Sequence, residues 1–396
     1  MKIGMILDKT FPPDPRVENE AVSLVKKGFE VYLFCLNYGN EKKDEIINGI
    51  KVKRYKSNKF IYKLSALVYT VPFYSFIMAK KINHFLQENK IDAIHIHDMQ
   101  IAEAVFKANE SLKLPTVLDL HDNMPEVIKF YPHLQKFPGK QLISPVKWKR
   151  KEEEFIKKAT KICTVSKEFI DEVVYRTGIS KNKIVLVPNT VQKEFYKNAI
   201  IHNSILTKYE DKFVILYLGD TAIRRGLLTA IKSLPQLIKK IPNIKLVIVG
   251  SNTTDSLLFN SVNESNLNDY VDFEGWQNVE LFPSYIKAST ICISPLYRNI
   301  QHDVAYANKL FQYMSFAKPL LVSNAIAQKK IIEKVKAGLV HIEKDSDDFA
   351  KKILMLYEDE NLRLKLGENG KHFVENEFNW EKTSEKLIDL YKNIKY

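Results

Sequence analysis

The sequence has little of what several protein classes require. Its three cysteines, Cys35, Cys163 and Cys292, lie far apart in apolar runs, which argues against a disulfide framework or a structural zinc site and favours a reducing cytoplasm. Only 13 glycines and 15 prolines occur in 396 residues, too few for a fibrous or disordered chain. The longest apolar stretch, residues 64–79, is interrupted by Pro72 and is shorter than the roughly 20 residues of a membrane-spanning helix. The amino terminus lacks the pattern of a signal peptide, so we expect a cytoplasmic globular protein.

The excess of basic residues limits the choice of partners without deciding it. Lysine and arginine outnumber aspartate and glutamate by 60 to 47, and the net charge of +13 implies an anionic partner. Phosphate compounds, nucleic acids and anionic membrane surfaces all qualify. The chain has no zinc finger, RRM-type aromatic motif or compact helix-turn-helix pattern, so a nucleic-acid partner rests on the charge alone and is not expected.

Short apolar runs alternate with helical stretches in two successive series. Several runs are almost continuously apolar, as in parallel strands covered on both faces. Two such series predict an α/β protein with two doubly wound Rossmann-like domains, at residues 1–200 and 201–377, and a last helix at 378–396 that joins the first domain. The predicted strands are residues 3–7, 31–36, 52–55, 93–97, 116–120, 162–165 and 184–187, then 213–218, 246–249, 271–273, 291–294, 320–323 and 339–342.

The loop after the first predicted strand reads DKTFPPDPRVE and lacks the GxGxxG of an NAD-binding domain. The glycines of that motif let a pyrophosphate approach the helix, so their absence argues against a dehydrogenase. The loop instead carries Asp14 and Arg16 beside stiff prolines, and we expect both to face the ligand. The plainer alternative is a helix start, with Asp14 as N-cap and Pro15 at the first helical position.

Histidines and carboxylates cluster at the ends of two neighbouring predicted strands. His95 and His97 are two residues apart and share one face of a strand, and Asp98 follows them. His121 and Asp122 follow the next strand. Such folds bind ligands at the carboxyl ends of their strands, so we expect at least one of these histidines to be functional, although a lone strand-end histidine is more often structural.

The second predicted domain opens with a basic turn, YLGDTAIRRGL. Gly219 permits close approach of a ligand to the backbone, and Arg224 and Arg225 place guanidiniums near the start of a helix. This pattern predicts a diphosphate clamp, with a solvated basic turn as the alternative. Further on, Asn308 can cap a predicted helix whose free N–H groups, with Lys309, would form a second anion site.

The segment Asp345-Ser346-Asp347 matches the DxD motif by which A-type glycosyltransferases hold a metal ion. Here it precedes a predicted helix, where acidic side chains cap N–H groups and favour the helix dipole. We therefore interpret it as a helix cap and expect no metal site.

The whole chain resembles glycosyltransferase family 4, the retaining enzymes of the B-type fold (GT-B). In that fold two Rossmann-like domains face each other across a cleft. Each matching segment is weak alone, but their order is specific and covers essentially all 396 residues. The segments are FPPDPRVENEAVSLVKKGFEV, IHIHD, LDLHD, CTVSKEF, KIVLVPNTV, YLGDTAIRRGL, KLVIVG, VDFEGW, NKLFQYMSFAKPLLVSN, AGLVHI and FNWEKTSEKLIDLY.

The resemblance implies roles for single residues. His121 matches the family's histidine near the reacting sugar and is the expected catalytic residue. Arg225 matches the basic residue, usually lysine, that binds the donor phosphate. The expected donor-binding residues are Gly219, Arg224, Arg225, Asn308, Lys309 and Gln312. The expected acceptor and cleft residues are Asp14, Arg16, His97, Asp122 and Asn189.

The chain departs from the family pattern at four positions. Thr190 replaces the glycine that usually follows Asn189. The two glutamates of the E-x7-E motif are replaced by Val304 and Gln312, of which the glutamine can still hydrogen-bond the nucleotide ribose. Asp220 stands where many members have arginine. These changes do not alter the expected fold or class of enzyme, but they affect which sugar donor we expect the protein to bind.

The resemblance implies transfer of a hexose from a nucleoside diphosphate sugar to a hydroxyl of a glycan or lipid-linked acceptor. The anomeric configuration would be retained, and neither a metal nor another cofactor would be needed. A nucleotide-sugar epimerase of the same fold, and an inactive scaffold that binds nucleotide sugars, are the alternatives.

Two basic aromatic stretches of the first domain predict peripheral contact with an anionic membrane, at the inner face of the cell membrane. Aromatic side chains suit the bilayer interface and lysines suit anionic headgroups. The alternative is that the first stretch consists of ordinary helices with their apolar faces in the core. The residues are Lys59, Phe60, Tyr62, Lys63, Tyr69, Phe73, Tyr74, Phe76, Lys80, Lys81 and Phe85, then Lys147, Trp148, Lys149, Arg150 and Lys151.

Overall fold

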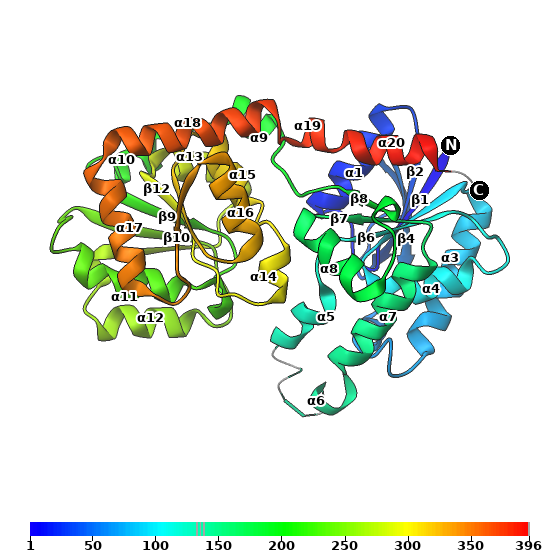
Figure 1. Ribbon diagram of the computed structural model, residues 1–396. Coiled ribbons are helices and arrows are strands. Elements are labelled where there is room, and N and C mark those ends of the chain that lie inside the picture. Colours follow the sequence, from blue (N-terminus) through cyan, green and yellow to red (C-terminus); the bar gives the residue numbers. More distant parts are fainter. Residues whose placement is uncertain (132–133, 135, 138, 395–396) are drawn as a thin grey trace. The chain divides into compact units, whose positions relative to one another are not determined.

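The computed structural model describes residues 1–131, 134, 136–137 and 139–394 (Figure 1). The side chains of Lys59, Tyr62 and Lys63 also lie outside the described part. The chain forms two compact units: unit 1 is Met1–Pro188 with Ser384–Tyr396, and unit 2 is Asn189–Thr383. The sequence predicted domain boundaries at 200/201 and 377/378. In the structure the boundaries between the two units fall at 188/189 and at 383/384.

Unit 1 is built on an eight-stranded sheet with the order β3-β4-β2-β1-β5-β6-β7-β8. Its neighbouring strands are parallel except for β3 and β4. The strands are β1 (Lys2–Ile6), β2 (Glu30–Asn37), β3 (Asp44–Ile47), β4 (Ile50–Lys56), β5 (Ala93–His97), β6 (Thr116–Leu120), β7 (Lys161–Thr164) and β8 (Ile184–Leu186). The helices are α1 (Pro15–Lys26), α2 (Lys59–Ser65), α3 (Phe73–Glu88), α4 (Ala102–Ala108), α5 (Met124–Val127), α6 (Gly139–Leu142), α7 (Pro145–Lys158), α8 (Lys167–Thr177) and α20 (Glu385–Asn393).

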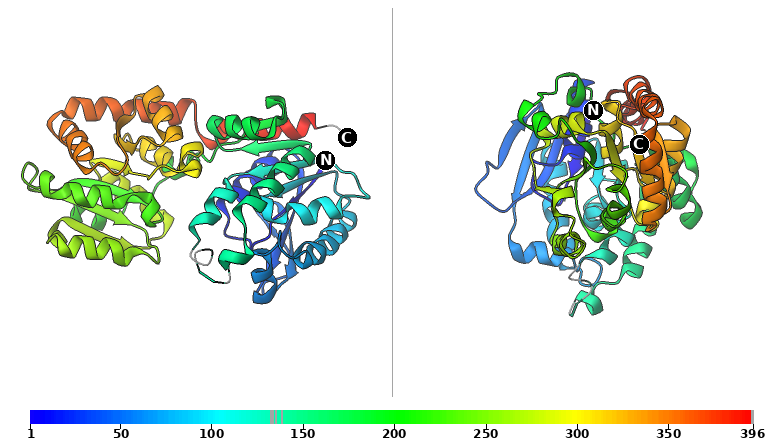
Figure 2. Two further views of the ribbon diagram at one scale, coloured as in Figure 1. Left: turned by 60° about the horizontal axis from the view of Figure 1, so that its bottom comes forward. Right: turned by 90° about the vertical axis from the view of Figure 1, so that its left-hand side faces the viewer.

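Unit 2 contains a six-stranded parallel sheet with the order β11-β10-β9-β12-β13-β14, and helices cover both faces of it (Figure 2). The strands are β9 (Phe213–Leu218), β10 (Ile244–Val249), β11 (Val271–Gly275), β12 (Ile291–Ser294), β13 (Leu320–Ser323) and β14 (Gly338–His341). The helices are α9 (Glu194–Lys197), α10 (Asn203–Lys208), α11 (Leu227–Leu237), α12 (Asp255–Glu264), α13 (Phe282–Ala288), α14 (Ile300–Val304), α15 (Lys309–Ser315), α16 (Ile326–Val335), α17 (Ser346–Glu358), α18 (Glu360–Asn376) and α19 (Trp380–Thr383).

The prediction of two doubly wound Rossmann-like domains is confirmed. Strand β9 shows why its sequence is apolar throughout: Ile215 and Tyr217 pack into the core on one face of the sheet, and Leu216 and Leu218 into the core on the other. A sheet buried on both faces leaves the loops at the carboxyl ends of its strands as the place for polar, ligand-binding side chains.

Helix α1 begins as the plainer reading of its sequence predicts. The Asp14 carboxylate accepts a hydrogen bond from the backbone N–H of Val17 at 3.2 Å, and Pro15 occupies the first helical position. The helix stops before Gly28, whose φ of 86° is readily adopted only by glycine.

Among the described helices, none combines the length and the apolar character that crossing a membrane requires.

Candidate active site

His121 follows β6 and has a carboxylate at each ring nitrogen. Its Nδ1 lies 3.2 Å from Asp119 Oδ2, and its Nε2 lies 3.0 Å from Asp98 Oδ2. Burial alone would lower the pKa of His121, but the two carboxylates outweigh it and raise that pKa well above 6.5. His121 is therefore an imidazolium at neutral pH, and its side chain remains 14% exposed.

Asp98 holds this histidine from a strained backbone position. Its φ of 66° and ψ of 158° lie in a region that residues other than glycine rarely adopt. The same carboxylate lies 3.6 Å from Lys9 Nζ. Burial would raise the pKa of Asp98, and the charges of His121 and Lys9 reverse this and lower it. Asp98 was not among the predicted site residues, yet it lies at the centre of this strand edge.

Lys9, in the loop after β1, is surrounded by acidic groups at the same edge. Burial would lower the pKa of its ammonium, but the carboxylates of Asp98, Asp8, Asp14 and Asp122 together raise it. Two of the predicted acceptor residues, Asp14 and Asp122, thus lie close enough to Lys9 to raise the pKa of its ammonium.

Arg16 lies beneath this edge instead of facing a ligand. Its Nε and Nη2 donate to the two carboxylate oxygens of Asp119 at 2.8 and 2.6 Å, and Nη2 also lies 2.9 Å from Glu20 Oε1. The side chain is 6% exposed. The expected contact with the acceptor is therefore corrected: Arg16 is the buried counter-ion that keeps Asp119 ionised below His121.

Glu20, His95, His97 and Asp119 are fully buried, and ligand atoms of all four lie within 4.8 Å of one another. Such a set resembles a metal site. However, the Arg16 guanidinium already contacts both carboxylates, so a metal ion would have to share them with a fixed positive charge. These residues fit a buried ion-pair network better than a metal centre.

The same network explains where His97 and the last helix lie. His97 is 0% exposed with Nδ1 3.5 Å from Asp119 Oδ2, so it supports the strand edge and does not face an acceptor as expected. His95 Nδ1 lies 2.7 Å from the Tyr391 hydroxyl, which ties α20 to unit 1. This contact agrees with the expectation that the last helix joins the first domain.

In unit 2 the end of β9 brings Lys309 against the backbone. Gly219 has a φ of 110°, and a Cβ at this position would lie 3.3 Å from Lys309 Nζ. That ammonium lies 3.6 Å from the centre of the Tyr217 ring. Burial and then the charge of Arg225 lower the pKa of Lys309 well below 10.5. A bound anion would favour the charged form of this lysine and raise its pKa again.

Arg224 and Arg225 follow on the same edge, as the sequence predicts. Asp220 Oδ2 lies 3.0 Å from Arg225 Nε and 3.7 Å from Arg224 Nη2. Gly226 is required beside them, because a Cβ there would lie 1.8 Å from the Pro295 carbonyl oxygen and the φ is 78°. The basic turn is thus packed against the loop after β12.

His302, on α14, contacts this turn through a defined tautomer. A guanidinium can only donate, so His302 Nε2 accepts from Arg224 Nη1 at 3.4 Å, and Nδ1–H donates to the Tyr297 carbonyl at 2.7 Å. Burial and the two neighbouring arginines lower the pKa of His302 to about 4. His302 is therefore neutral and holds Arg224 in place, a role that its sequence position alone did not indicate.

The expected anion site at the start of α15 is only partly present. Asn308 has helical dihedral angles and makes no side-chain cap, and α15 has seven residues. Lys309 remains as the basic group of this segment. Gln312 is half-buried on the same helix, and Val304 is 7% exposed, so no carboxylate stands at the position of the first family glutamate.

Asn189 and Thr190 begin unit 2. Asn189 is half-buried, and the Thr190 hydroxyl, at the position of the family glycine, lies 2.9 Å from that of Thr383. The expected role of Asn189 toward the acceptor stays a prediction. The helix-cap interpretation of the DxD-like segment is confirmed, because the Asp345 carboxylate accepts the N–H groups of Asp347 and Asp348.

The aromatic residues of the predicted membrane stretches divide between surface and core. Phe60, Phe73 and Phe76 are exposed. Tyr69, Tyr74, Phe85 and Trp148 are buried in unit 1, so the expectation that these four contact a membrane is wrong.

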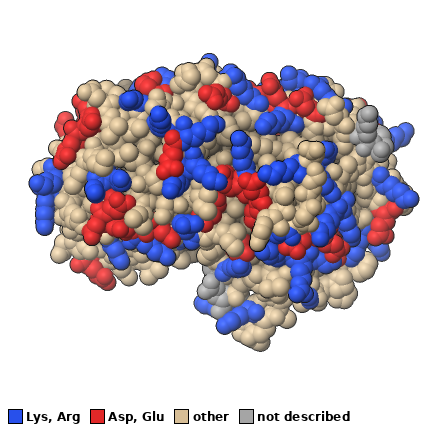
Figure 3. All heavy atoms as spheres, in the orientation of Figure 1, with Lys and Arg blue, Asp and Glu red and all other residues tan. Residues whose placement is uncertain are grey.

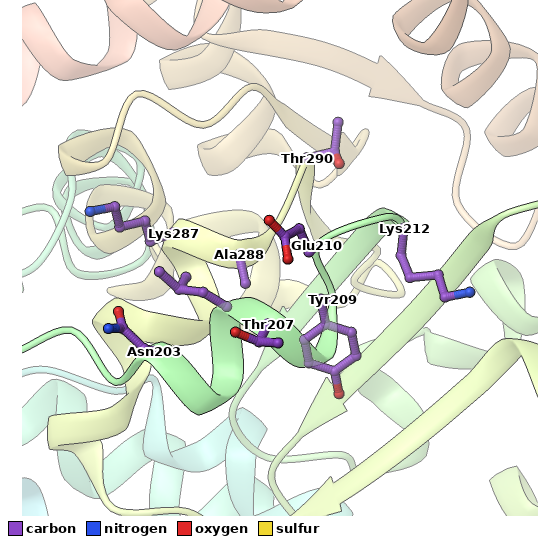
Figure 4. Close-up of a pocket in the computed structure, with 9 residues that line it drawn as sticks. Asn203, Thr207, Tyr209, Glu210, Lys212, Lys287, Ala288 and Thr290 are labelled. Atoms are coloured by element: carbon purple, nitrogen blue, oxygen red, sulfur yellow. The ribbon is translucent and has the colours of Figure 1, made fainter.

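A pocket of about 450 Å³ lies elsewhere in unit 2 (Figure 4). Lys212 and Thr290 in its lining directly precede β9 and β12, so it opens at the amino ends of the strands. The basic turn lies at the opposite, carboxyl ends, so the pocket is separate from that turn.

Two family models match the chain. Residues 16–195 match the model described as Glycosyltransferase Family 4, and residues 200–373 match the one described as Glycosyl transferases group 1. Between them they cover most of both units.

Individual relatives agree with this assignment. A capsular polysaccharide biosynthesis glycosyltransferase, CapM of Staphylococcus aureus, is 26% identical over 247 residues, which are 59% of this chain and 61% of that protein. The chain thus matches less than two thirds of CapM. An uncharacterized glycosyltransferase of Methanocaldococcus jannaschii is 22% identical over 99% of this chain and 98% of its own.

Solved structures share the fold. Sucrose-phosphate synthase from Thermosynechococcus elongatus superposes with a TM-score of 0.77 at 18% identity, over 99% of this chain and 98% of that one. The Anabaena protein HepE in complex with UDP superposes over all of both chains with a TM-score of 0.76 at 14% identity. The chain therefore belongs to the glycosyltransferases of the family 4 type, with the B-type fold of two Rossmann-like domains.

Proposed function

We propose that this glycosyltransferase moves a hexose from a nucleoside diphosphate sugar to a hydroxyl of a glycan or lipid-linked acceptor, with retention of configuration and without a metal ion. The observation that carries the proposal is the gathering of Arg224, Arg225 and Lys309 at the carboxyl end of β9, beside the backbone of Gly219. Arginine binds phosphate with two parallel hydrogen bonds, and lysine adds a compact charge.

These cations suit the chemistry of sugar transfer. As the glycosidic bond to the diphosphate breaks, negative charge develops on the leaving oxygens. Preorganised positive groups stabilise that charge most effectively where water is partly excluded. Lys309 is buried at this edge, so water is partly excluded around it; burial lowers its pKa, and a bound anion would favour its charged form. In the proposed reaction the positive charge near the leaving group comes from these side chains.

His121 would act on the sugar or the acceptor through its positive charge. Both of its ring nitrogens face carboxylates, so it holds its protons firmly and is a poor general base. A cation at this position favours a transition state in which negative charge develops on nearby oxygen atoms.

A screen of nucleotide sugars tests the proposal. We would measure the melting temperature of the protein with UDP-, GDP-, ADP-, CDP- and TDP-linked hexoses and with the free diphosphates. A ligand at 100 times its dissociation constant stabilises the fold by about 2.7 kcal/mol. We expect one base to give a clear rise, followed by turnover of that donor when a suitable acceptor is added. If no nucleotide of the panel raises the melting temperature, the proposed donor site is wrong.

One observation favours a second candidate, a scaffold that binds nucleotide sugars without turnover. Val304 and Gln312 replace both glutamates of the family motif, and Val304 is buried. Binding of a donor with neither transfer nor hydrolysis across a broad acceptor panel would favour this candidate.

The proposed acceptor is carried at the cytoplasmic face of a membrane, to which a basic lobe of unit 1 would bind. We define the basic lobe as the described residues 127–131, 134, 136–137 and 139–151, which include α6 and the start of α7 and contain seven lysines or arginines but no aspartate or glutamate. Figure 3 shows basic and uncharged atoms on this lobe, at the bottom of the view. Exposed apolar side chains accompany the charges: Phe130, Tyr131, Phe137, Leu142 and Val146.

The exposed start of α3 belongs to the same region. The Thr70 hydroxyl donates to the Leu142 carbonyl at 2.5 Å, which joins the turn before α3 to α6. Phe73 and Phe76 follow this turn and are exposed. Aromatic side chains at the headgroup level together with nearby lysines are typical of proteins bound peripherally to anionic membranes.

A further inference from the structure

A single carboxylate lies within the basic turn of unit 2. Asp220 Oδ2 is 3.0 Å from Arg225 Nε and 3.7 Å from Arg224 Nη2. It therefore contacts both guanidiniums that the proposed function assigns to the donor phosphates.

This carboxylate is held firmly in its position. Its other oxygen, Oδ1, accepts hydrogen bonds from Asn252 Nδ2 at 2.6 Å and from the backbone N–H of Ala222 at 3.2 Å. The Tyr217 hydroxyl donates to the Asp220 carbonyl at 2.6 Å and fixes the backbone as well. A bound diphosphate would thus share the arginines with a negative charge that cannot easily move away.

The charge of Asp220 is permanent at physiological pH. Partial burial would raise the pKa of the carboxyl, but Arg225 and the hydrogen bonds from Arg225, Ala222 and Asn252 lower it below 3.8. Asp220 therefore offsets part of the positive charge that Arg224, Arg225 and Lys309 supply.

We propose that Asp220 is a specificity-determining residue that weakens the binding of free nucleoside diphosphate more than that of the sugar-linked donor. This inference rests on the proposed function. A free terminal phosphate, with a pKa near 6, carries about one more negative charge at pH 7 than a phosphate esterified to a sugar. Repulsion by Asp220 acts on that extra charge, so it favours release of the diphosphate product after transfer.

The test is calorimetric titration of wild type and Asp220→Asn with UDP and UDP-glucose and with GDP and GDP-mannose. Asparagine has nearly the same shape and can still accept from Arg225, so the substitution mainly removes the charge. We expect the variant to bind the free diphosphate about tenfold more tightly, with a clearly smaller gain for the sugar-linked form. The gain should shrink at high salt, because partly exposed charges are screened.

Asp272→Asn is the matched control. Like Asp220, Asp272 is a partly buried carboxylate with a basic partner: its Oδ1 lies 3.0 Å from Lys245 Nζ. It lies near the amino end of β11, however. This control removes the same charge from unit 2 and should leave both affinities unchanged. Asp220→Ser is a second test variant, to be used if the melting curve shows that Asp220→Asn does not fold.

The outcomes separate the two proposals. Unchanged or weaker binding of the free diphosphate to Asp220→Asn would overturn the inference and make Asp220 a positioning residue for Arg225. An equal gain for the free and the sugar-linked form would overturn the proposed discrimination. If neither wild type nor variant binds any of the four nucleotides or any other nucleotide of the melting screen, the proposed donor site itself fails and the inference fails with it.

Discussion

His121 Nε2 lies 3.0 Å from a carboxylate oxygen of Asp98, and the backbone of Asp98 has a φ of 66°. Backbone strain of this kind costs about 1–3 kcal/mol and persists where the surrounding structure enforces it. Here Asp98 is 3% exposed and also contacts Lys9. The strained residue thus fixes the direction and the charge of the one predicted catalytic side chain.

We predict that His121→Gln lowers turnover at least 100-fold while nucleotide affinity changes less than about threefold. The glutamine remains polar but cannot carry the charge that would act in the transition state. Steady-state kinetics with the true acceptor and calorimetry with the nucleotide would measure the two effects. His84→Gln, at an exposed histidine of unit 1, is the control. Full activity of His121→Gln would contradict the assigned role.

The raised pKa of His121 also predicts how stability depends on pH. The unfolded value is about 6.5 and the folded value is higher, so the stabilisation from this histidine is complete below pH 6.5 and is lost as the pH rises through the folded pKa. The difference in melting temperature between wild type and His121→Gln should therefore shrink as the pH rises above 6.5. A difference that grows with pH would show that His121 is neutral in the folded protein.

Arg16→Leu should destabilise unit 1 by about 3–5 kcal/mol, because it leaves the carboxylates of Asp119 and Glu20 buried without their counter-ion. Hydrogen exchange of the backbone amides in β5 and β6 would report the loss within this unit. Arg150→Leu, at an exposed arginine of α7, is the matched control. Equal protection in both variants would mean that Arg16 is not needed to neutralise the two carboxylates.

Much of this arrangement could be predicted from the sequence, because it depends on local patterns. The apolar runs indicated thirteen of the fourteen described strands, and the polar residues just after them marked the carboxyl edges of both sheets. Strand β3 was missed because it is short and mostly exposed. Its signal was the Asn48-Gly49 turn, with φ values of 50° and 83°, which is typical of a two-residue hairpin to β4.

The partners of the site residues could not be predicted, because they are distant in sequence. Arg16 and Asp119 are 103 residues apart, and only the folded sheet brings them together. Asp119 lies within the apolar run LDL, and a buried carboxylate requires a positive partner, but the sequence does not show which residue supplies it. Trp148 was assigned to the surface because lysines flank it. It is instead buried on α7, where its ring packs edge-on against that of Tyr69, with the two ring centres 5.0 Å apart.

Arg225→Ala should weaken binding of the nucleoside diphosphate roughly 10- to 150-fold, the loss expected for one charge-assisted hydrogen-bonding group. Calorimetry with the base selected by the melting screen would measure it. Arg363→Ala is the control, since this arginine of α18 donates to the backbone carbonyls of Leu356 and Tyr357. If both variants keep the wild-type affinity, the phosphate is bound elsewhere in unit 2.

The last prediction concerns the basic lobe and anionic membranes. Wild-type protein should sediment with vesicles containing phosphatidylserine at low salt, less at high salt, and little with neutral phosphatidylcholine vesicles. Each basic residue near the surface contributes about 1 kcal/mol, so Lys136→Glu with Lys140→Glu should lower binding at least tenfold. Phe137→Ser should lower it further, because this side chain is 83% exposed and can enter the interface.

The control for the lobe is a charge reversal of equal size in unit 2. Lys239→Glu with Lys240→Glu changes the net charge by the same amount at two exposed lysines after α11. If this variant loses as much binding as the lobe variant, attraction depends on total charge and not on the lobe. Equal and negligible binding of wild type to anionic and neutral vesicles would contradict a membrane-borne acceptor and favour a soluble one. Binding that depends on protein concentration, with dimers in solution, would mean that the exposed aromatic side chains contact a second copy of the chain instead.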